Sequence, residues 1–161
     1  MTGKSFKDLF LNTKCNISFE GNEQYLGCGG LFNIQAEVNG QISFWPEDGY
    51  SNNFHCEWFM EMPVDSLISI SYSDFNLESS SDTACSADYL LIRNDNDDAA
   101  GPVSTLPIMA KQCGTTIPSD LLLRGNRLLL VFHSNHENNY RGFKMNYEII
   151  KEGFQISDFY S

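Results

Sequence analysis

Apolar and polar residues alternate along several short stretches of this chain, and that period of two constrains the fold more than any other feature. In FHCEWFME, from Phe54 to Glu61, every second residue beginning with Phe54 is apolar or cysteine. GFKMNYEI, from Gly142 to Ile149, alternates in the same way. Successive side chains of a strand point to opposite faces of a sheet. Both stretches therefore predict strands with one buried face.

Three further apolar stretches predict strands, namely LISISYS (67–73), YLLIR (89–93) and RLLLVFH (127–133). The last is apolar enough for a central position in a sheet. Turn-forming pairs and clusters separate the stretches: Asn39-Gly40, Pro46 to Gly49, Gly101-Pro102, Gly125-Asn126 and Asn138-Asn139. No stretch predicts a helix longer than one or two turns. Short strands at this spacing predict an all-β protein, a sandwich of two antiparallel sheets.

Length and charge narrow the class of protein. The chain has 161 residues, enough for one domain with its own core, and 42% of them are hydrophobic. The formal net charge is -11, which disfavours nucleic acid and anionic membranes as partners and favours a cationic one. No apolar run is long enough to cross a bilayer.

The cysteines point to an oxidising compartment, although the first residues lack the apolar core of a secretion signal. No two cysteines have the CxxC spacing of a zinc ribbon. Two bridges among five cysteines can form in about 15 ways, and spacing alone selects none of them. The five are Cys15, Cys28, Cys56, Cys85 and Cys113. Asn16-Ile17-Ser18 is a glycosylation sequon. We therefore expect an extracellular protein that is glycosylated at Asn16.

An ordered series of fragments resembles the CUB domain. The fragments are CGG at Cys28, GQISF at Gly40, WPEDGYSNNFHCEW at Trp45, FNLE at Phe75, CSADYLLI at Cys85, QCG at Gln112 and FHSN…RGFKMNY at Phe132. The resemblance implies a CUB domain over 28–150, with an N-terminal extension at 1–27 and a C-terminal tail at 151–161. It also implies a disulfide-bonded β-sandwich, in agreement with the alternation.

The same resemblance implies two bridges, Cys28–Cys56 and Cys85–Cys113. Each would stabilise the fold by about 3.5 kcal/mol through loop closure. Cys15 falls outside the family pattern, so we expect it to pair with a segment outside this fragment, to join a second copy of the chain, or to be unpaired.

Many CUB domains bind one calcium ion at an end of the sandwich, and the positions that match their ligands here are Glu78, Asp88 and Asn135. Tyr50 matches a tyrosine that supports the site. Calcium prefers six to eight hard oxygen ligands, which carboxylates and carbonyls from separate loops supply. The resemblance therefore implies a calcium site in this chain.

Three departures from the family weaken that site. Asn135 replaces an aspartate, Ala87 replaces a tyrosine, and the loop from Glu78 to Asp88 is about two residues longer than usual. We expect weak calcium binding, on the order of 10⁻⁴ to 10⁻³ M. The remaining acids of this region have no family role and are interpreted as solvated loop residues: Asp82, Asp95, Asp97 and Asp98.

Other chemistry is less favoured. His133 and His136, with Glu137 beside them, invite a zinc site, but residues three apart on a strand point to opposite faces. No signature places a serine against a general base, so we predict that the protein is not an enzyme. Trp45 and Trp58 are interpreted as core residues.

The sequence thus predicts a recognition or adhesion module, secreted or part of the extracellular portion of a membrane protein, and a fragment of a larger protein. Glu78, Asp88 and Tyr50 would bind an extracellular protein with an exposed basic residue, because a partner lysine commonly reaches the calcium-holding acids of CUB domains. One alternative is an assembly module that forms a homodimer through Cys15 or self-associates through an exposed sheet face. A regulatory module of a protease is another.

Overall fold

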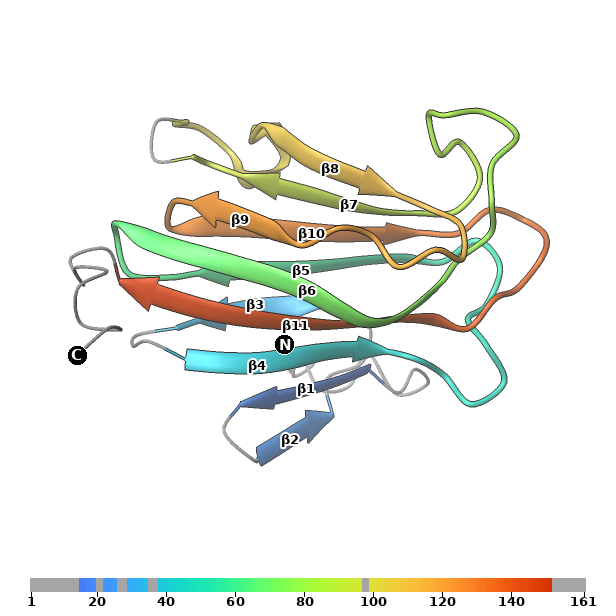
Figure 1. Ribbon diagram of the computed structural model, residues 1–161, viewed down its shortest axis with the longest axis horizontal. Coiled ribbons are helices and arrows are strands. Elements are labelled where there is room, and N and C mark those ends of the chain that lie inside the picture. Colours follow the sequence, from blue (N-terminus) through green and yellow to red (C-terminus); the bar gives the residue numbers. More distant parts are fainter. Residues whose placement is uncertain (1–14, 20–21, 26–28, 35–37, 97–98, 152–161) are drawn as a thin grey trace, which may run out of the picture.

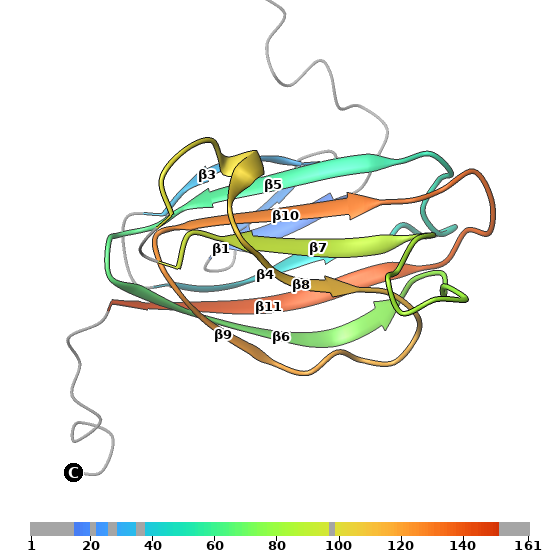
Figure 2. The same cartoon turned by 90° about the horizontal axis from the view of Figure 1, so that it is seen from above.

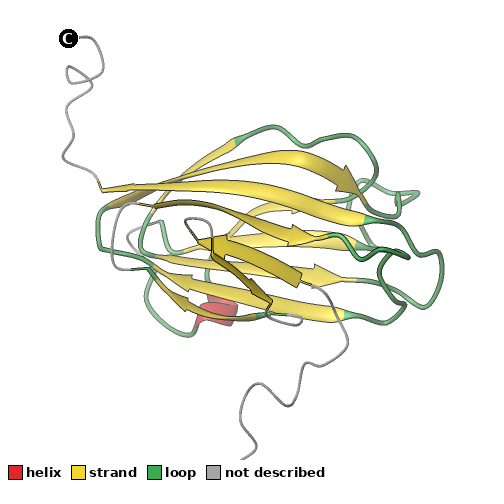
Figure 3. Ribbon diagram, turned by 90° about the horizontal axis from the view of Figure 1, so that it is seen from below, coloured by secondary structure: helices red, strands yellow, loops and turns green. Residues whose placement is uncertain are grey.

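The computed structural model describes residues 15–19, 22–25, 29–34, 38–96 and 99–151. Within these ranges, eleven strands form two sheets that pack face to face as a sandwich (Figures 1 and 2). The one helical segment among the described residues is a short 3-10 helix, η2 (Val103–Thr105), which is red in Figure 3. No helix in the described part of the chain is long and apolar enough to span a membrane.

The first sheet has six strands in the order β2-β1-β4-β11-β6-β9. Their bounds are β2 (Asn22–Tyr25), β1 (Cys15–Phe19), β4 (Val38–Phe44), β11 (Gly142–Lys151), β6 (Ser66–Asn76) and β9 (Leu121–Arg124). All pairings in this sheet are antiparallel. Strands β1 and β2, which fall within the predicted N-terminal extension, thus belong to the sheet, and the backbone of Asn16 pairs with Ser43.

The second sheet has five strands in the order β3-β5-β10-β7-β8. Their bounds are β3 (Gly30–Asn33), β5 (His55–Glu61), β10 (Arg127–His133), β7 (Tyr89–Asn94) and β8 (Ile108–Gln112). One pairing differs from the predicted antiparallel pattern: β3 runs parallel to β5. The next strand after β3 lies in the other sheet, so no tight turn forces β3 to be antiparallel to its neighbour.

The five predicted strands are all present, and β10 is central as predicted. The predicted turn at Asn39-Gly40 is wrong, since both residues lie inside β4 and pair with Glu148 and Tyr147 of β11. An Asn-Gly pair makes a hairpin only where the flanking strands are neighbours, and β3 and β4 belong to different sheets.

The core between the sheets is rich in aromatic rings. Phe44 of the six-stranded sheet packs on Phe132 of the five-stranded sheet with ring centroids 4.7 Å apart. Trp58 is fully buried beside Phe44, as predicted. The interpretation of Trp45 as a core residue is wrong, because this residue follows β4, is only partly buried, and has Arg141 Cζ and Lys144 Nζ each 5.2 Å from its ring centroid. Tyr50 packs edge-on against Phe132 at 5.0 Å, which carries the aromatic core to one end of the sandwich.

Candidate functional site

Three loops meet at the end of the sandwich that lies on the right of Figure 1. They are residues 45–54 between β4 and β5, residues 77–88 between β6 and β7, and residues 134–141 between β10 and β11. Backbone hydrogen bonds join the first and third loops, from Tyr50 N–H to the Tyr140 carbonyl (3.0 Å) and from Asn53 N–H to the Asn135 carbonyl (2.6 Å). Segments far apart in the sequence therefore form one surface.

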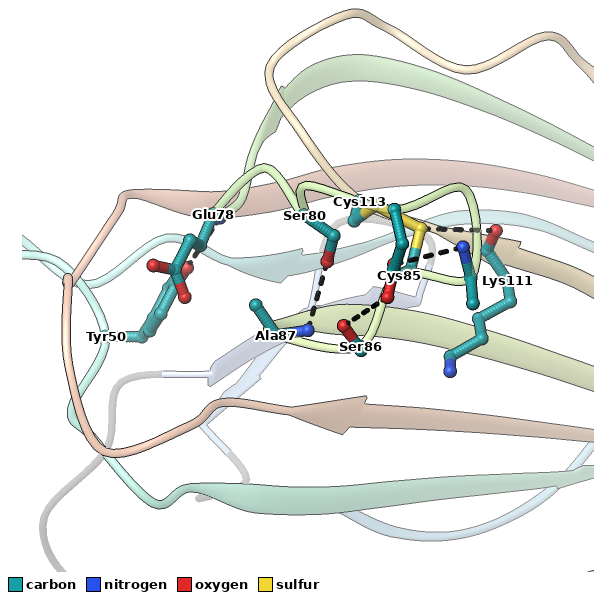
Figure 4. Close-up of a disulfide and its surroundings, with 10 residues drawn as sticks. Tyr50, Glu78, Ser80, Cys85, Ser86, Ala87, Lys111 and Cys113 are labelled. Carbon is teal, nitrogen blue, oxygen red and sulfur yellow. Dashed lines mark hydrogen bonds between the residues drawn. A yellow bond between two sulfur atoms is a disulfide. The ribbon is translucent and has the colours of Figure 1, made fainter.

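The 77–88 loop is fixed at its base by a disulfide. Cys85 and Cys113 are bonded, with Cα atoms 5.6 Å apart, which confirms the predicted bridge (Figure 4). Two backbone hydrogen bonds reinforce it, from Leu77 N–H to the Gly114 carbonyl and from Gly114 N–H to the Glu78 carbonyl. The longer loop is thus anchored to the segment after β8. Cys56 is also disulfide-bonded, whereas its predicted partner Cys28 lies outside the described residues.

Hydrogen bonds within the 77–88 loop organise its turn. Asp82 accepts from the Ala84 N–H (3.1 Å) and the Ser86 hydroxyl (2.8 Å). Ser80 accepts from the Ala87 N–H at 3.0 Å, a contact visible in Figure 4. Asp82, interpreted from the sequence as a solvated residue, is exposed but also stabilises the turn.

Tyr50 links the two predicted acidic ligands. Its hydroxyl donates a short hydrogen bond to Asp88 and accepts one from the Glu78 N–H at 3.1 Å. The preceding Gly49 has a φ of +84°, and a side chain there would place Cβ 2.6 Å from the Tyr140 carbonyl oxygen. Only glycine allows the loop to approach so closely. The tight turn therefore directs Tyr50 between the two carboxylates.

Asn135 bridges the same two carboxylates from the third loop. Its backbone N–H donates to Asp88 Oδ1 at 2.8 Å, and its side-chain Nδ2 donates to Glu78 Oε2 at 2.7 Å. Asn138 Nδ2 donates to the other Glu78 oxygen at 2.6 Å. The structure thus brings together the four residues assigned from the sequence, Tyr50, Glu78, Asp88 and Asn135.

Asn138 is a site residue that the sequence reasoning did not find. The Asn138-Asn139 pair predicts a turn, and Asn138 has a positive φ of 60°, which asparagine tolerates well. That signal fixes the backbone conformation, but the contact with Glu78 depends on where two distant loops lie.

The two carboxylates are buried and have no basic side chain beside them within the described residues. Asp88 is fully buried and Glu78 is 8% exposed. Within the described part of the chain, the ion pairs involve neither of them. Burial raises the pKa of the Asp88 carboxyl, while the hydrogen bonds from Tyr50 and Asn135 lower it and the nearby Glu78 raises it further. Burial and the bond to Asp88 raise the pKa of Tyr50.

The oxygen atoms at this loop end fit a hard cation, except that the Asn135 amide has its nitrogen turned toward Glu78. The carboxylates of Glu78 and Asp88 offer anionic oxygens from two loops, and calcium prefers such oxygens. Asn135, however, presents its nitrogen to Glu78, and its Oδ1 accepts from the Glu137 N–H at 2.9 Å. Rotation of the amide would turn this oxygen toward the carboxylates. Glu78, Asp88 and Asn135 would then hold the ion, which would supply the positive charge that the pair lacks.

The histidine pattern considered for zinc does not form a site in this end of the molecule. His133 ends β10, whereas His136 lies exposed in the following loop, where its carbonyl accepts from Asn52 at 2.8 Å. Across the described ranges, no three His, Cys, Asp or Glu side chains are gathered ready to hold a metal.

A disulfide-bonded sandwich of two β-sheets with acidic loops gathered at one end defines a class of small extracellular modules. Residues 28–147 match the CUB domain family, and the chain belongs to that family. CUB domains are non-catalytic modules of protein interaction, and the family places this chain outside the cell.

The relatives are much longer proteins. Cubilin from Canis lupus familiaris is 31% identical over 140 residues, which are 87% of this chain but 4% of cubilin. Human tumor necrosis factor-inducible gene 6 protein is 31% identical over 120 residues, 74% of this chain and 40% of that protein. The MASP-1 CUB2 domain, solved bound to Ca²⁺, superimposes with a TM-score of 0.58 at 18% identity, covering 74% of this chain and 98% of that domain. This last likeness concerns the fold.

Proposed function

We propose that the chain is an extracellular recognition module that binds a partner protein, without catalysing a reaction, through the loop end containing Tyr50, Glu78 and Asp88. The partner would present a lysine or arginine side chain to the two carboxylates. The neighbouring pair of buried carboxylates carries this proposal, because hydrogen bonds from neutral donors leave the two like charges repelling each other, and a cation would balance both.

Calcium would organise the surface before the partner binds. Bound by Glu78, Asp88 and the side-chain oxygen of Asn135, the ion would hold the 77–88 and 134–141 loops together. Its two positive charges would balance the two carboxylates, so the remaining oxygen lone pairs could accept hydrogen bonds from a partner ammonium group. The Ca²⁺-bound MASP-1 CUB2 domain has the same fold, which supports calcium as the ion.

A lysine analogue tests the partner chemistry without knowledge of the natural partner. Metal-stripped protein is titrated with calcium by calorimetry, and the loaded protein is then titrated with N-acetyl-lysine amide while backbone amide NMR signals are followed. We expect the signals of Asn135 and its loop to shift. N-acetyl-norleucine amide, which lacks the charge, is the matched ligand control.

Two variants complete the test. Glu78→Gln should lose both calcium heat and the lysine-dependent shifts. Glu137→Gln alters an exposed acid of the same loop and should retain both, since Glu137 contacts Asn135 through its backbone only. Equal shifts with the lysine and norleucine ligands would contradict the proposed recognition of a basic side chain.

A second candidate function, assembly, is favoured by exposed apolar side chains on three edge strands. Leu31 of β3, Ile108 of β8 and Leu122 of β9 are 68%, 55% and 70% exposed. Edge strands can pair with other chains. Sedimentation with and without reductant distinguishes the candidates, because a reductant-sensitive dimer would indicate assembly through Cys15. A regulatory role beside a protease domain also remains a prediction.

A further inference from the structure

The outer face of the six-stranded sheet has an open hollow of about 360 Å³ over β4, β11 and β6, which are neighbours in Figure 1. Two rows of directly paired residues line it, Gln41–Asn146–Ser71 and Asn39–Glu148–Ser69. On the same strands, the adjacent residues Ile42, Met145 and Ile70 are fully buried in the core. Because successive residues of a strand alternate between faces, the two rows face outward.

The lining of the hollow is polar and nearly uncharged. Gln41 Nε2 donates to Asn146 Oδ1 at 2.9 Å, which holds these two amides together. Among the described residues, the remaining Gln41 oxygen and Asn146 nitrogen have no further hydrogen-bond partner. Amides and serine hydroxyls both donate and accept, and Glu148 adds the one ionisable group of the two rows. The hollow therefore offers a ligand several donors and acceptors.

This lining excludes most classes of ligand. The core of a protein interface is rich in aromatic and other apolar side chains, and a pocket for a drug-like molecule is mostly apolar. One carboxylate is too few for a hard cation, and an anion such as phosphate would need a basic side chain. A neutral ligand rich in hydroxyl and amide groups remains, which is the chemistry of a carbohydrate.

Register places Asn16 of the glycosylation sequon on the same face of the sheet. Its backbone pairs with Ser43 of β4, and Ser43 pairs with Lys144 of β11. Ser43 lies between two fully buried residues of β4, and Lys144 forms an ion pair of 3.3 Å with Asp74 of β6. This row therefore also faces outward, since directly paired residues of an antiparallel ladder lie on one face.

The row of Asn16 is next to the hollow. Along β4, Ser43 and Gln41 are two residues apart, as Lys144 and Asn146 are along β11. Strands lie about 4.8 Å apart and alternate residues about 6.8 Å apart, so the backbone of Asn16 is roughly 8 Å from that of Gln41 and roughly 12 Å from that of Asn146. Two linked sugar rings can span this distance.

We propose that the N-linked glycan of Asn16 lies along the outer face of the six-stranded sheet and that its two N-acetylglucosamine units occupy the hollow. The hydroxyl and acetamido groups of these sugars match the donors and acceptors of the lining. Asn146 and Gln41 bind the second sugar through the amide atoms that their mutual hydrogen bond leaves available. The proposal rests on modification of the sequon at Asn16, which the extracellular setting permits.

A glycan in this position leaves the loop end open to a partner. Asn39 and Gln41 lie in the first half of β4, whereas the 45–54 loop follows the end of that strand. The glycan thus covers polar groups of one sheet face, and Tyr50, Glu78 and Asp88 stay outside the covered region.

The test uses the full chain secreted from animal cells that make only high-mannose glycans. Mass spectrometry measures the occupancy of Asn16, and an endoglycosidase then trims the glycan to its first N-acetylglucosamine. We expect the trimmed protein to melt about 2 to 4 °C lower than the intact glycoprotein, because the contacts of the second sugar are lost. The backbone amide NMR signals of Asn146 and Ser71 should shift on trimming.

Variants of the lining show whether the hollow is responsible. Asn146→Ala removes a hydrogen-bonding side chain and Ser71→Arg fills the hollow, so each should abolish the difference in melting temperature between the intact and trimmed forms. Because each variant is compared with its own trimmed form, a general loss of stability cancels. Ser73→Ala is the matched control, since Ser73 is an exposed serine of β6 that does not line the hollow, and it should keep the difference.

Four results would overturn the proposal. They are an unmodified Asn16, equal melting temperatures of the intact and trimmed protein, and a glycan-dependent difference that persists in both Asn146→Ala and Ser71→Arg. The fourth is a dimer of Asn16→Gln in sedimentation that Ser71→Arg dissociates, which would assign the hollow to a second copy of the chain.

Discussion

The side-chain amide of Asn135 donates a hydrogen bond of 2.7 Å to the Glu78 carboxylate. At this position many CUB domains have an aspartate, which can only accept when it is ionised. Asparagine therefore gives the loop end a hydrogen bond that an aspartate would replace with repulsion. Asn135 stabilises the loops without a metal, and it lowers the negative charge available to a metal.

Asn135→Asp should lower the stability of the calcium-free protein and raise its affinity for calcium. Without calcium, we expect a lower melting temperature than that of the parent, because a third carboxylate joins two that are already buried. With calcium, the added charge should raise affinity by about tenfold or more, given how strongly ligand charge tunes such sites. Thermal unfolding with and without millimolar calcium, together with calorimetry, measures both effects. Asn138→Asp, which also loses a donor to Glu78, is a matched comparison at a position without a family ligand. A variant at Asn135 that gained no calcium affinity would remove this residue from the ligand set.

Tyr50→Phe should weaken the site as well as the fold. The hydroxyl contacts both Asp88 Oδ2 and the Glu78 N–H, so its loss removes the hydrogen bond that each of these two buried atoms makes with Tyr50. Each unsatisfied group costs about 1 to 3 kcal/mol. The matched control is Tyr72→Phe, which removes another buried phenol, whose hydroxyl bonds to Gln112. Chemical denaturation should show both variants destabilised, and calorimetry should show reduced calcium affinity for Tyr50→Phe alone.

The response to pH should depend on whether calcium is bound. Because burial raises the pKa of Asp88, the folded chain without calcium binds this proton more tightly than the unfolded chain does. That contribution to stability is present below the ordinary pKa of aspartate and is lost as pH rises through the raised pKa. Calcium needs the ionised carboxylate, so its affinity should increase over the same interval. The difference in melting temperature between calcium-loaded and calcium-free protein should therefore grow from about pH 4 toward neutrality. In Asp88→Asn this growth should be absent, and an unchanged profile would show that Asp88 is not the titrating group.

The sequence predicted the strands well because a period of two is a local property of a strand in contact with a core. It did not predict the order of the strands, since β4, β5 and β6 alternate between the two sheets and their neighbours are distant in sequence. Glu78, Asp88, Asn135 and Tyr50 were found through the resemblance alone. Local pattern could not have grouped them, because three separate loops supply them.

Asp95 illustrates the limit of reading charge from sequence. It begins the acidic run interpreted as loop solvation, but that interpretation is wrong for this residue, which is only 3% exposed. Its Oδ2 lies 3.3 Å from Arg127 Nε, and its Oδ1 accepts from the Asn126 N–H at 3.1 Å. Nothing near Asp95 in the sequence indicates that a turn thirty residues later will cover it.

Arg127→Met should therefore be strongly destabilising. Removing one partner of a buried ion pair leaves an uncompensated charge, at a cost of about 3 to 5 kcal/mol, reduced here because Arg127 is partly exposed. The guanidinium also donates to the carbonyls of Gly101 and Ala99, so the loop before η2 should loosen as well. Arg124→Met, on an exposed arginine of β9, is the comparison in urea denaturation. Equal stability of the two variants would contradict a structural role for the Asp95–Arg127 pair.

Loss of each of the two bridges should have a different effect on calcium binding. Peptide mapping of the unreduced protein first establishes which cysteines are joined. We expect Cys85 joined to Cys113, as in the structure, and Cys28 joined to Cys56, as the resemblance implies.

The bridge at Cys85 and Cys113 anchors the 77–88 loop, so Cys85→Ser with Cys113→Ser should lower calcium affinity as well as stability. Cys56 is the second residue of β5, on its core face, and lies outside the 77–88 loop. Cys28→Ser with Cys56→Ser should therefore lower stability, by about 3.5 kcal/mol on the loop-closure estimate, with less effect on calcium. Calorimetry on both double variants at a temperature where each remains folded makes the comparison. A peptide linking Cys15 to any of the other four cysteines would refute the assignment, and equal loss of calcium affinity in the two variants would show that the Cys85–Cys113 bridge has no special role in holding the site.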